Sequence, residues 1–233
     1  MKIALLGYGK MGKVIERIAL ERGHEIVLRK SSTSSYDGLT NADVAIDFSI
    51  PESAVCNITA CFDTNIPVVC GTTGWLDQYD EMVSLCKSKN GSFIYGSNFS
   101  LGVNIFFELN AYLAKMMSKI DQYKVSMEEI HHTQKLDSPS GTAISLAKGI
   151  IENSNYINWT LENPEPNEIR IDAKRINNVP GTHSIFYDSE VDQIEIKHTA
   201  HNREGFALGA VIAAEWLQNK KGVFTMKDVL SLN

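Results

Sequence analysis

The sequence predicts an α/β fold: an N-terminal Rossmann-like, doubly wound parallel sheet, followed by a C-terminal α+β domain with a mainly antiparallel or mixed sheet. In the first 100 residues, short apolar runs at 3–6, 26–28, 44–46, 68–70 and 93–95 alternate with helix-like stretches at 14–22, 52–62 and 77–88. Short buried strands separated by helices are typical of parallel sheets, because parallel strands need crossover connections. A glycine-rich turn directly after the first run favours the same fold.

The pattern changes after residue 100, where longer segments alternate apolar and polar residues. A helical pattern at 103–118 precedes a strand at 123–132, a helix from Ser140 to about Ile151, and strands at 169–176, 183–188 and 192–200. Such alternation predicts strands with one solvated face, so we expect a helix-backed sheet. The apolar stretch 205–222 ends in basic residues before Gly222, as helices often do, and is expected to pack on the first domain. The predicted domains are therefore 1–102 with 206–233, and 103–205.

Composition and charge exclude several classes of protein. The chain has 233 residues, 43% of them hydrophobic, and a net charge of -6 with dispersed basic residues, so we expect neither a nucleic-acid nor an anionic-membrane partner. No apolar run approaches the roughly 20 residues of a membrane span, and we expect no signal peptide before the strand-like KIALLGYG. Because Cys56, Cys61, Cys70 and Cys86 show no CxxC spacing, we expect free thiols, no metal centre and a cytoplasmic location.

The first motif is GYGKMG at 7–12, which stands between a strand and a helix. In a dinucleotide-binding turn, Gly7 would allow the tight bend, Gly9 the close approach of a pyrophosphate, and Gly12 the packing of helix on strand. An ordinary glycine-rich turn is the alternative. The predicted cofactor contacts in this motif are Gly7, Tyr8, Gly9, Lys10, Met11 and Gly12.

Two cations follow the second strand, where an acidic residue often binds the ribose 2′-hydroxyl of NAD. Arg29 and Lys30 at this point suit a 2′-phosphate, so we predict NADPH, NADH or both as cofactor, with no acid here to enforce NADH. A pair of solvated surface charges is the alternative.

Three more loops follow predicted strands: DFSIPE at 47–52, CGTTGW at 70–75 and YGSNFSLGVN at 95–104. Ligands bind at the carboxyl ends of the strands in open α/β sheets, and small residues there let backbone amides approach a ligand. Each loop taken singly could be an ordinary turn. The predicted cofactor contacts in these loops are Phe48, Ser49, Gly71, Thr72, Thr73, Gly96, Ser97, Asn98 and Phe99.

The stretch EEIHHTQKLDSPSGTA at 128–143 carries the candidate chemistry. A hydride acceptor that bears carboxylates needs a cation, a proton donor and often a helix N-terminus. Lys135, His131 and His132 supply the first two. An isolated pair of neighbouring histidines would more often be one buried and one exposed side chain, but the nearby lysine favours a site.

The same stretch predicts the start of a helix. Asp137 or Ser138 is expected to cap it, with Pro139 in its first turn. The predicted anion-binding amides are those of Ser140, Gly141 and Thr142.

The segment EIHHTQKLDSPSGTA resembles the E-x-H-H-x-x-K-x-D-x-P-S-G-T-A signature of the 4-hydroxy-tetrahydrodipicolinate reductase (dihydrodipicolinate reductase) family. The glycine loop, DFS, CGTTG, SNFSLGVN and the final REGFALGAVIAAEWL follow in the family's order, so the resemblance covers nearly the whole chain. The glycine loop has one residue fewer than the G-x-G-G-x-M-G of many members, and Lys10 could replace an arginine there.

The resemblance implies NAD(P)H-dependent reduction of 4-hydroxy-tetrahydrodipicolinate, a small cyclic dicarboxylate, to tetrahydrodipicolinate in lysine and diaminopimelate biosynthesis. It also implies that 103–205 binds the substrate and builds a homotetramer, whereas the other domain binds the nicotinamide cofactor. Carried over to this chain, His131 is the acid/base residue, Lys135 the proton donor and a substrate contact, and His132 a substrate contact. Gly141 and Thr142 hold a substrate carboxylate, together with the neighbouring Ser140.

Two other functions stay open. A different amino-acid or semialdehyde dehydrogenase would share the glycine loop without needing His131, His132 and Lys135 together. A non-enzymatic NADP-binding sensor would keep the fold but would have no use for a proton donor.

Overall fold

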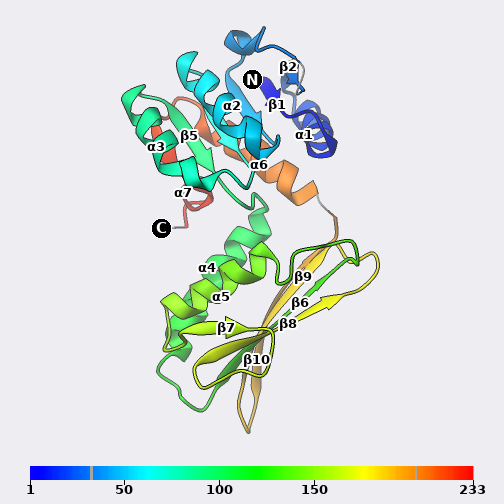
Figure 1. Cartoon of the computed structure of the whole chain (residues 1–233), viewed down its shortest axis with the longest axis vertical. Helices are drawn as coiled ribbons and strands as arrows, with labels where there is room; N and C mark the ends of the chain where they lie inside the picture. Colours follow the sequence, from blue (N-terminus) through cyan, green and yellow to red (C-terminus); the bar gives the residue numbers. More distant parts are fainter. Residues whose placement is uncertain (32–33, 203, 233) are drawn as a thin grey trace. The chain divides into compact units, whose positions relative to one another are not determined.

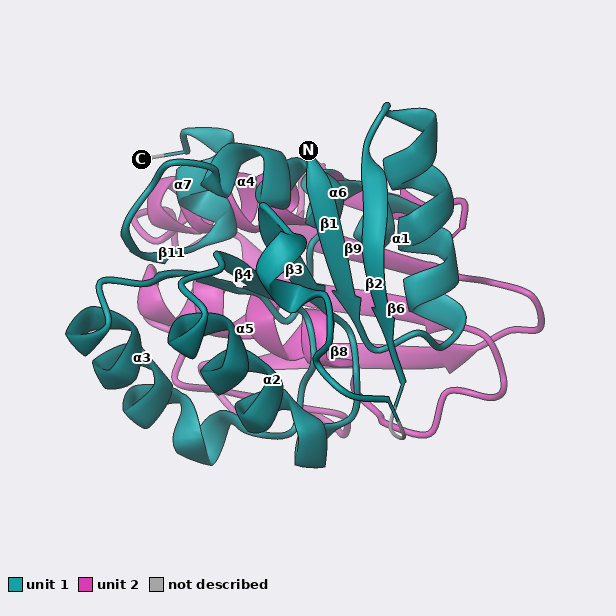
Figure 2. Cartoon of the chain, turned by 90° about the horizontal axis from the view of Figure 1, so that it is seen from above, with its two compact units in different colours: residues 1–101, 204–233 teal, residues 102–203 magenta. Residues whose placement is uncertain are grey.

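The computed structural model describes residues 1–31, 34–202 and 204–232. The chain divides into two compact units, unit 1 of Met1–Leu101 with Glu204–Asn233 and unit 2 of Gly102–Arg203 (Figure 2). Arg203, the first residue of the REGFALG segment, lies outside the described residues.

Unit 1 is built on a parallel sheet with the strand order β11-β5-β4-β3-β1-β2, which confirms the predicted Rossmann-like sheet. Its strands are β1 (Lys2–Leu6), β2 (Glu25–Lys30), β3 (Val44–Asp47), β4 (Val68–Cys70), β5 (Ser92–Tyr95) and β11 (Gly222–Phe224). Strand β11 was not predicted, and the expected role of Gly222 at a helix end was wrong. The preceding helix already ends at Leu217, and Gly222, with φ of 127°, begins β11.

Helices cover both faces of this sheet (Figures 1 and 2). One face packs on α1 (Lys10–Glu21), α6 (Glu204–Leu217) and α7 (Met226–Leu230), and the other on α2 (Pro51–Asp63) and α3 (Tyr79–Ser88). Two short 3-10 turns lie at Leu39–Asn41 and Leu76–Gln78. Along β1, Ile3 and Leu5 belong to the first core and Ala4 and Leu6 to the second, because successive side chains point to opposite faces. Helix α6 therefore returns to the first core, as its apolar sequence predicted.

Unit 2 contains a mixed five-stranded sheet with the order β10-β9-β6-β8-β7. Its strands are β6 (Lys124–His131), β7 (Asn158–Thr160), β8 (Glu168–Arg175), β9 (Gly181–Asp188) and β10 (Gln193–Ala200). The pairs β6·β8 and β7·β8 are parallel, whereas β6·β9 and β9·β10 are antiparallel. Helices α4 (Leu101–Met117) and α5 (Gly141–Glu152) supply the apolar residues that cover the sheet (Figure 1). The predicted mixed sheet is confirmed, although the three-residue β7 was not predicted.

Strand β6 shows how this sheet leads into a polar site. Its buried side chains alternate as Val125, Met127, Glu129 and His131. The first two belong to the apolar core under α4 and α5. The last two are titratable, so the core face changes from apolar to polar toward the end of the strand.

The cysteines are free thiols, as predicted: Cys61, Cys70 and Cys86 are buried and Cys56 is exposed. Burial raises the pKa of the Cys70 thiol well above its usual value. Among the described residues, no helix is both long enough and apolar enough to cross a membrane.

Candidate functional site

Four loops of unit 1 begin side by side at the carboxyl edge of the parallel sheet. Each is joined to the neighbouring strand by one backbone hydrogen bond beyond the strand end. These bonds run from Gly7 N–H to Lys30 O (3.0 Å), Phe48 N–H to Leu6 O (2.9 Å), Gly71 N–H to Asp47 O (2.9 Å) and Gly96 N–H to Cys70 O (3.1 Å). The three loops predicted to join the glycine loop therefore do so.

The glycine loop has the geometry that its sequence predicts. Gly7 has φ of 101°, and a Cβ there would lie 2.2 Å from the carbonyl oxygen of Phe48. A Cβ on Gly12 would lie 2.3 Å from the carbonyl oxygen of Gly7, so this glycine allows helix α1 to pack on the loop. Gly9 is the N-cap of α1, and among the described residues no atom lies within 4 Å of the position of its missing Cβ. The loop is closed on the protein side and open above Gly9.

A cavity of about 320 Å³ opens beside this loop, lined by residues that follow β1, β2 and β3. Strand β1 lies between β3 and β2, so the cavity occupies the topological switch point, where open α/β sheets bind ligands. Six predicted cofactor residues line it: Gly7, Tyr8, Gly9, Lys30, Phe48 and Ser49.

Other predicted cofactor residues support the loops from within. Thr72 is buried; its hydroxyl donates to Asp47 Oδ2 (2.7 Å) and accepts from Ser49 N–H (2.8 Å). Phe99 is buried in the core and its ring centroid lies 5.8 Å from that of Phe48. Met11 packs against the same core, Lys10 is exposed at the start of α1, and the other predicted positions lie in the β4 and β5 loops: Gly71, Thr73, Gly96, Ser97 and Asn98.

Asp47 was not predicted as a site residue, although it begins the DFS loop. Its carboxylate is fully buried and accepts hydrogen bonds from Asn57, Thr72 and Cys70. Burial raises the pKa of Asp47, and these hydrogen bonds oppose that change. An acid at the end of a buried strand was the available sequence signal.

The two predicted 2′-phosphate ligands have different surroundings. Arg29 donates from Nε to Glu16 Oε1 at 2.8 Å and also bonds it through Nη2, while the Tyr8 hydroxyl donates to Oε2 of the same carboxylate. The hydrogen bond from Arg29 lowers the pKa of Glu16. Lys30 lines the cavity, with Nζ 4.6 Å from the ring centroid of Tyr36. The sequence did not predict an acid beside Arg29, but α1 supplies Glu16 from thirteen residues earlier in the chain.

In unit 2, the two neighbouring histidines at the end of β6 enter different environments. His131 is buried, with Nδ1 3.5 Å from Glu129 Oε2, and Gly181 lies against its Nε2 side. His132 is half-buried and lines a cavity of about 350 Å³ together with Asn177, Pro180 and His201, among others. The predicted site residues are thus divided between the buried face of the sheet and the cavity beside its end.

Lys135 forms an ion pair that the sequence did not predict. Its Nζ lies 2.8 Å from both carboxylate oxygens of Asp137. This lysine lowers the pKa of Asp137 through the hydrogen bond, and its positive charge also opposes protonation of His131. In the folded chain, the charge of Lys135 therefore acts on the imidazole of His131.

The start of α5 differs from the prediction. Ser140 is the N-cap: its Oγ accepts from Ala143 N–H at 3.1 Å, so neither Asp137 nor Ser138 caps the helix and Pro139 precedes it. The amide of Ser140 donates to Glu129 Oε2 at 3.0 Å and is not part of the predicted anion site. Gly141 and Thr142 occupy the first two helical positions, at the positive end of the dipole of α5.

Beneath the helix start lies a buried polar cluster. Glu129 has no exposed surface and pairs with Arg175, whose Nη1 and Nη2 both lie 3.1 Å from Oε1. His183 Nε2 lies 3.1 Å from Ser140 Oγ and 3.7 Å from Glu129 Oε2. Glu129, Arg175 and His183 were not predicted as site residues. A usable signal existed for Glu129, since it is two residues from His131 on a strand and so shares its face.

Burial keeps both buried imidazoles neutral near pH 7. The pKa of His131 is lowered chiefly by burial, with Lys135 and Arg175 acting in the same direction and Glu129 opposing. Burial lowers the pKa of His183 further, to about 3. Neutral imidazoles can accept a proton at one nitrogen and donate from the other.

The low pKa of His183 predicts a pH-dependent stability. In the unfolded chain a histidine titrates near 6.5, so below that pH the unfolded state binds the extra proton and the folded state does not. Stability should fall as pH drops from 6.5 toward 3, by about 1.5 kcal/mol between pH 6.5 and 5 from this residue. Urea unfolding at both pH values should show this loss in the wild type and a smaller one in His183→Asn. Equal losses in the two proteins would contradict the assignment.

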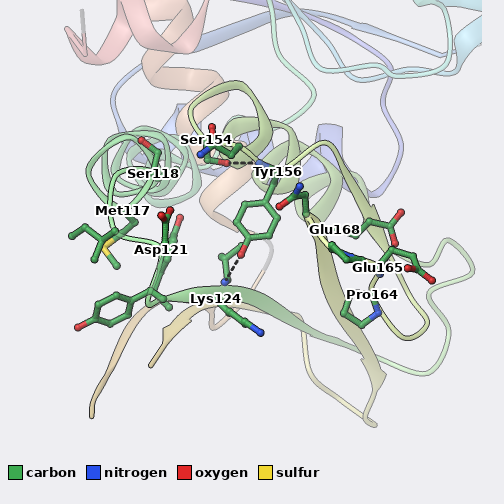
Figure 3. A pocket seen from close by; sticks show the side chains of 17 residues that line it. Met117, Ser118, Asp121, Lys124, Ser154, Tyr156, Pro164, Glu165 and Glu168 are labelled. Atoms are coloured by element: carbon green, nitrogen blue, oxygen red, sulfur yellow. Dashed lines mark hydrogen bonds between the residues drawn. The ribbon is translucent and has the colours of Figure 1, made fainter. Parts of the chain in front are cut away.

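A larger cavity of about 610 Å³ lies elsewhere in unit 2 (Figure 3). Met117, Asp121, Lys124 and Glu168 help to line it, and the Tyr156 hydroxyl accepts from Val125 N–H at 3.1 Å. Lys124 begins β6 whereas His131 ends it, which separates the two regions by roughly 20 Å along the strand. None of the predicted site residues lines this cavity.

Two family models together match nearly the whole chain, and the second also covers residues 204–230 of unit 1. Family models described as "Dihydrodipicolinate reductase, N-terminus" and "Dihydrodipicolinate reductase, C-terminus" match residues 1–99 and 102–230. The 4-hydroxy-tetrahydrodipicolinate reductase of Christiangramia forsetii is 58% identical over 99% of this chain and 98% of its own length. The enzyme of the same name from Archaeoglobus fulgidus is 34% identical over 99% of this chain and 100% of its own length.

A solved structure shares the fold. The dipicolinate-bound dihydrodipicolinate reductase from Paenisporosarcina sp. TG-14 superposes with a TM-score of 0.76 at 21% identity, covering 97% of both chains. With both halves of the family matched and a relative at 58% identity over nearly the full length, the chain belongs to the dihydrodipicolinate reductase family of NAD(P)H-dependent oxidoreductases.

Proposed function

We propose that this chain reduces 4-hydroxy-tetrahydrodipicolinate to tetrahydrodipicolinate with a nicotinamide cofactor, using Lys135 and His131 of unit 2 for the proton. The net change replaces a hydroxyl by hydrogen, so it consumes one hydride and one proton and releases water. The observation that carries the proposal is the arrangement after β6. His131 and the amide of Ser140 both lie against the buried Glu129. Lys135 lies between them in the chain and pairs with Asp137, whose carbonyl accepts a hydrogen bond from Arg175.

The glycine loop and the cavity at the switch point fit a dinucleotide. The open space at Gly9 would admit a pyrophosphate at the N-terminus of α1, and Lys30 would meet a 2′-phosphate in the cavity. Thr72 and Phe99 would hold the loops in shape, since their side chains are buried. When bound, the nicotinamide supplies the hydride.

The residues of unit 2 would bind the dicarboxylate and deliver the proton. The N–H groups of Gly141 and Thr142 would hold one carboxylate at the positive end of α5. Lys135 Nζ would exchange part of its pairing with Asp137 for a second carboxylate and donate the proton. His131 would relay protons as a neutral imidazole, and His132 would contact the substrate from the adjoining cavity.

We also propose a cytoplasmic homotetramer. Resemblance to the family supports this assembly, as does the exposure of β10, an edge strand whose row of unpaired backbone groups favours pairing. The free cysteines fit a reducing compartment. Sedimentation at micromolar concentration checks the assembly.

The experiment that tests the function is NADPH oxidation with substrate made in place by the preceding synthase. We expect absorbance at the nicotinamide band to fall only when synthase, its substrates and this protein are all present. Oxidation with an amino acid or a semialdehyde instead would favour another dehydrogenase. Cofactor binding without oxidation of any of these substrates would favour the sensor.

Cofactor selectivity gives a second prediction. Replacing Arg29 and Lys30 by glutamine should raise KM for NADPH by about ten- to a hundredfold more than KM for NADH, since a charge-assisted contact is worth roughly 1.5–3 kcal/mol. Glu16→Gln should act in the opposite direction, because it releases Arg29 from its carboxylate partner. Steady-state kinetics with both cofactors measures this, with Lys13→Gln on the exposed side of α1 as the matched control. Equal changes for NADPH and NADH would exclude these residues from 2′-phosphate recognition.

A further inference from the structure

Glu129 is a buried carboxylate whose oxygens are both engaged. Arg175 donates to Oε1 from Nη1 and Nη2, each at 3.1 Å, and the amide of Ser140 donates to Oε2 at 3.0 Å. The glutamate side chain has no exposed surface and that of Arg175 is 21% exposed. Burying a carboxylate is costly unless it is paired and hydrogen-bonded, and here both conditions hold.

This pair ties down the segment that carries the proposed proton donor. Arg175 Nη2 also donates to the carbonyl of Asp137 at 2.7 Å. The ion pair therefore bonds the loop at two points, Asp137 through Arg175 and Ser140 through Glu129. Lys135 stands just before the first of these points, and the amides at the start of α5 follow the second. The other flank of the pair is His131, with Nδ1 3.5 Å from Glu129 Oε2.

The same cluster could alternatively be a metal-binding site. Ligand atoms of Glu129, His131 and His183 lie within 4.8 Å of one another. However, the guanidinium of Arg175 already neutralises the carboxylate and would repel a divalent cation. His183 Nε2 is also within hydrogen-bond distance of Ser140 Oγ. The contacts therefore favour a structural polar network.

We propose that Glu129, with Arg175, is a positioning residue of the reductase site, which holds the Lys135 loop and the start of α5 in place and presents a negative charge to His131. The inference rests on the proposed function and adds to it a residue that does not touch substrate. Glu129 orients three groups at once because it lies between the strand end, the loop and the helix.

Glu129→Gln removes the charge while keeping the size. We expect kcat to fall by roughly ten- to a hundredfold and KM for the dicarboxylate to rise, since displacement of a reacting group by about 1 Å can cost a hundredfold. The Kd for NADPH should not change, because the proposed cofactor residues belong to unit 1. The matched control is Glu128→Gln, the neighbouring glutamate, which is ion-paired with Lys174 and outside the core.

A second readout needs no turnover. The charged and titratable groups facing His131 are Glu129 on its own strand, Arg175 on β8, His183 on β9, and Lys135 and Asp137 in the loop. Glu129 opposes the lowering of the pKa of His131, so its neutralisation should lower that pKa further. NMR titration of the six histidines, with His131→Gln to assign the signal, measures the shift. The limb of the pH–rate profile that reports His131 should move to lower pH with it.

Two more variants separate positioning from folding. Glu129→Asp keeps the charge, so it should retain a near wild-type titration of His131 while losing part of kcat. Glu129→Gln combined with Arg175→Gln leaves no unpaired buried charge, and it should recover thermal stability more than kcat. A Glu129→Gln protein with wild-type kcat, KM and His131 titration would overturn the proposal. The proposal would also be overturned if, in every variant, the loss of kcat equalled the loss of folded protein. A wild type that fails to oxidise NADPH would refute the proposed function, whereas the His131 titration would still decide the role of Glu129.

Discussion

Replacing Lys135 by alanine is expected to lower kcat by about 10²–10⁴-fold, the usual range for a positioned proton donor. The same change should raise KM for the dicarboxylate, because the ammonium that pairs with Asp137 is also the cation proposed to hold a substrate carboxylate. Kd for NADPH, measured by fluorescence or calorimetry, should stay at the wild-type value. Steady-state kinetics and binding measurements on one preparation test all three expectations.

Lys174→Ala is the matched control for this loss. Lys174 is an exposed lysine on β8 whose partners are Glu128 and Asp172 on the solvated side of the sheet. Its removal should leave kcat and KM unchanged. If Lys135→Ala kept kcat within a few-fold of the wild type, the assignment of the proton donor would be wrong.

His131→Gln should lower kcat by about a hundredfold and leave KM for the substrate nearly unchanged. Glutamine fills a similar volume beside Gly181 and Glu129 but cannot relay a proton. The melting temperature should therefore stay close to that of the wild type, because burial keeps this imidazole uncharged near neutral pH. Turnover, KM and thermal melting of the variant provide the measurement.

The alternative role for His131 is structural, and it predicts the opposite pattern. A merely packed histidine would lose melting temperature on replacement and keep its rate per folded molecule. His24→Gln serves as a control, because His24 bonds Glu215 within unit 1 and lies outside the proposed site. A His131→Gln protein that melts normally and turns over near the wild-type rate would exclude a catalytic role.

Local sequence patterns were enough to predict most elements of both sheets. The apolar runs of β1, β3, β4 and β5 are buried on both faces, and the alternation in β6 and at the start of β8 reports a core on one side. Strands β7 (NWT) and β11 (GVF) escaped prediction because each has three residues and neither is a continuous apolar run like the VVC of β4. Such short segments carry no period of their own.

The candidate site was predictable where one segment holds several of its residues. His131, Lys135, Gly141 and Thr142 fall within twelve positions, so spacing alone joined them. Glu16 and Arg175 were out of reach, since each meets its partner only after the chain folds back. Glu16 approaches Arg29 from another element of unit 1, and Arg175 meets Glu129 from 46 residues away.

The N-cap of α5 shows a different limit. Asp137, Ser138 and Ser140 all have side chains that favour a cap, and sequence preference does not choose among them. Tertiary contacts select Ser140. Glu129 accepts a hydrogen bond from the amide of Ser140, and Arg175 donates one to the carbonyl of Asp137, which lies outside the helix. The same contacts removed one amide from the predicted anion site.

The most direct test of the central claim is an isotope transfer experiment with the wild-type protein. NADPH that carries two deuterium atoms at C4 of the nicotinamide is mixed with 4-hydroxy-tetrahydrodipicolinate, which the synthase forms in place. The mass of the product is then measured by mass spectrometry. Tetrahydrodipicolinate carrying one deuterium from the cofactor, formed only when this protein is present, is the predicted result. Product without the label, or loss of NADPH that does not depend on the dicarboxylate, would contradict the proposed reaction.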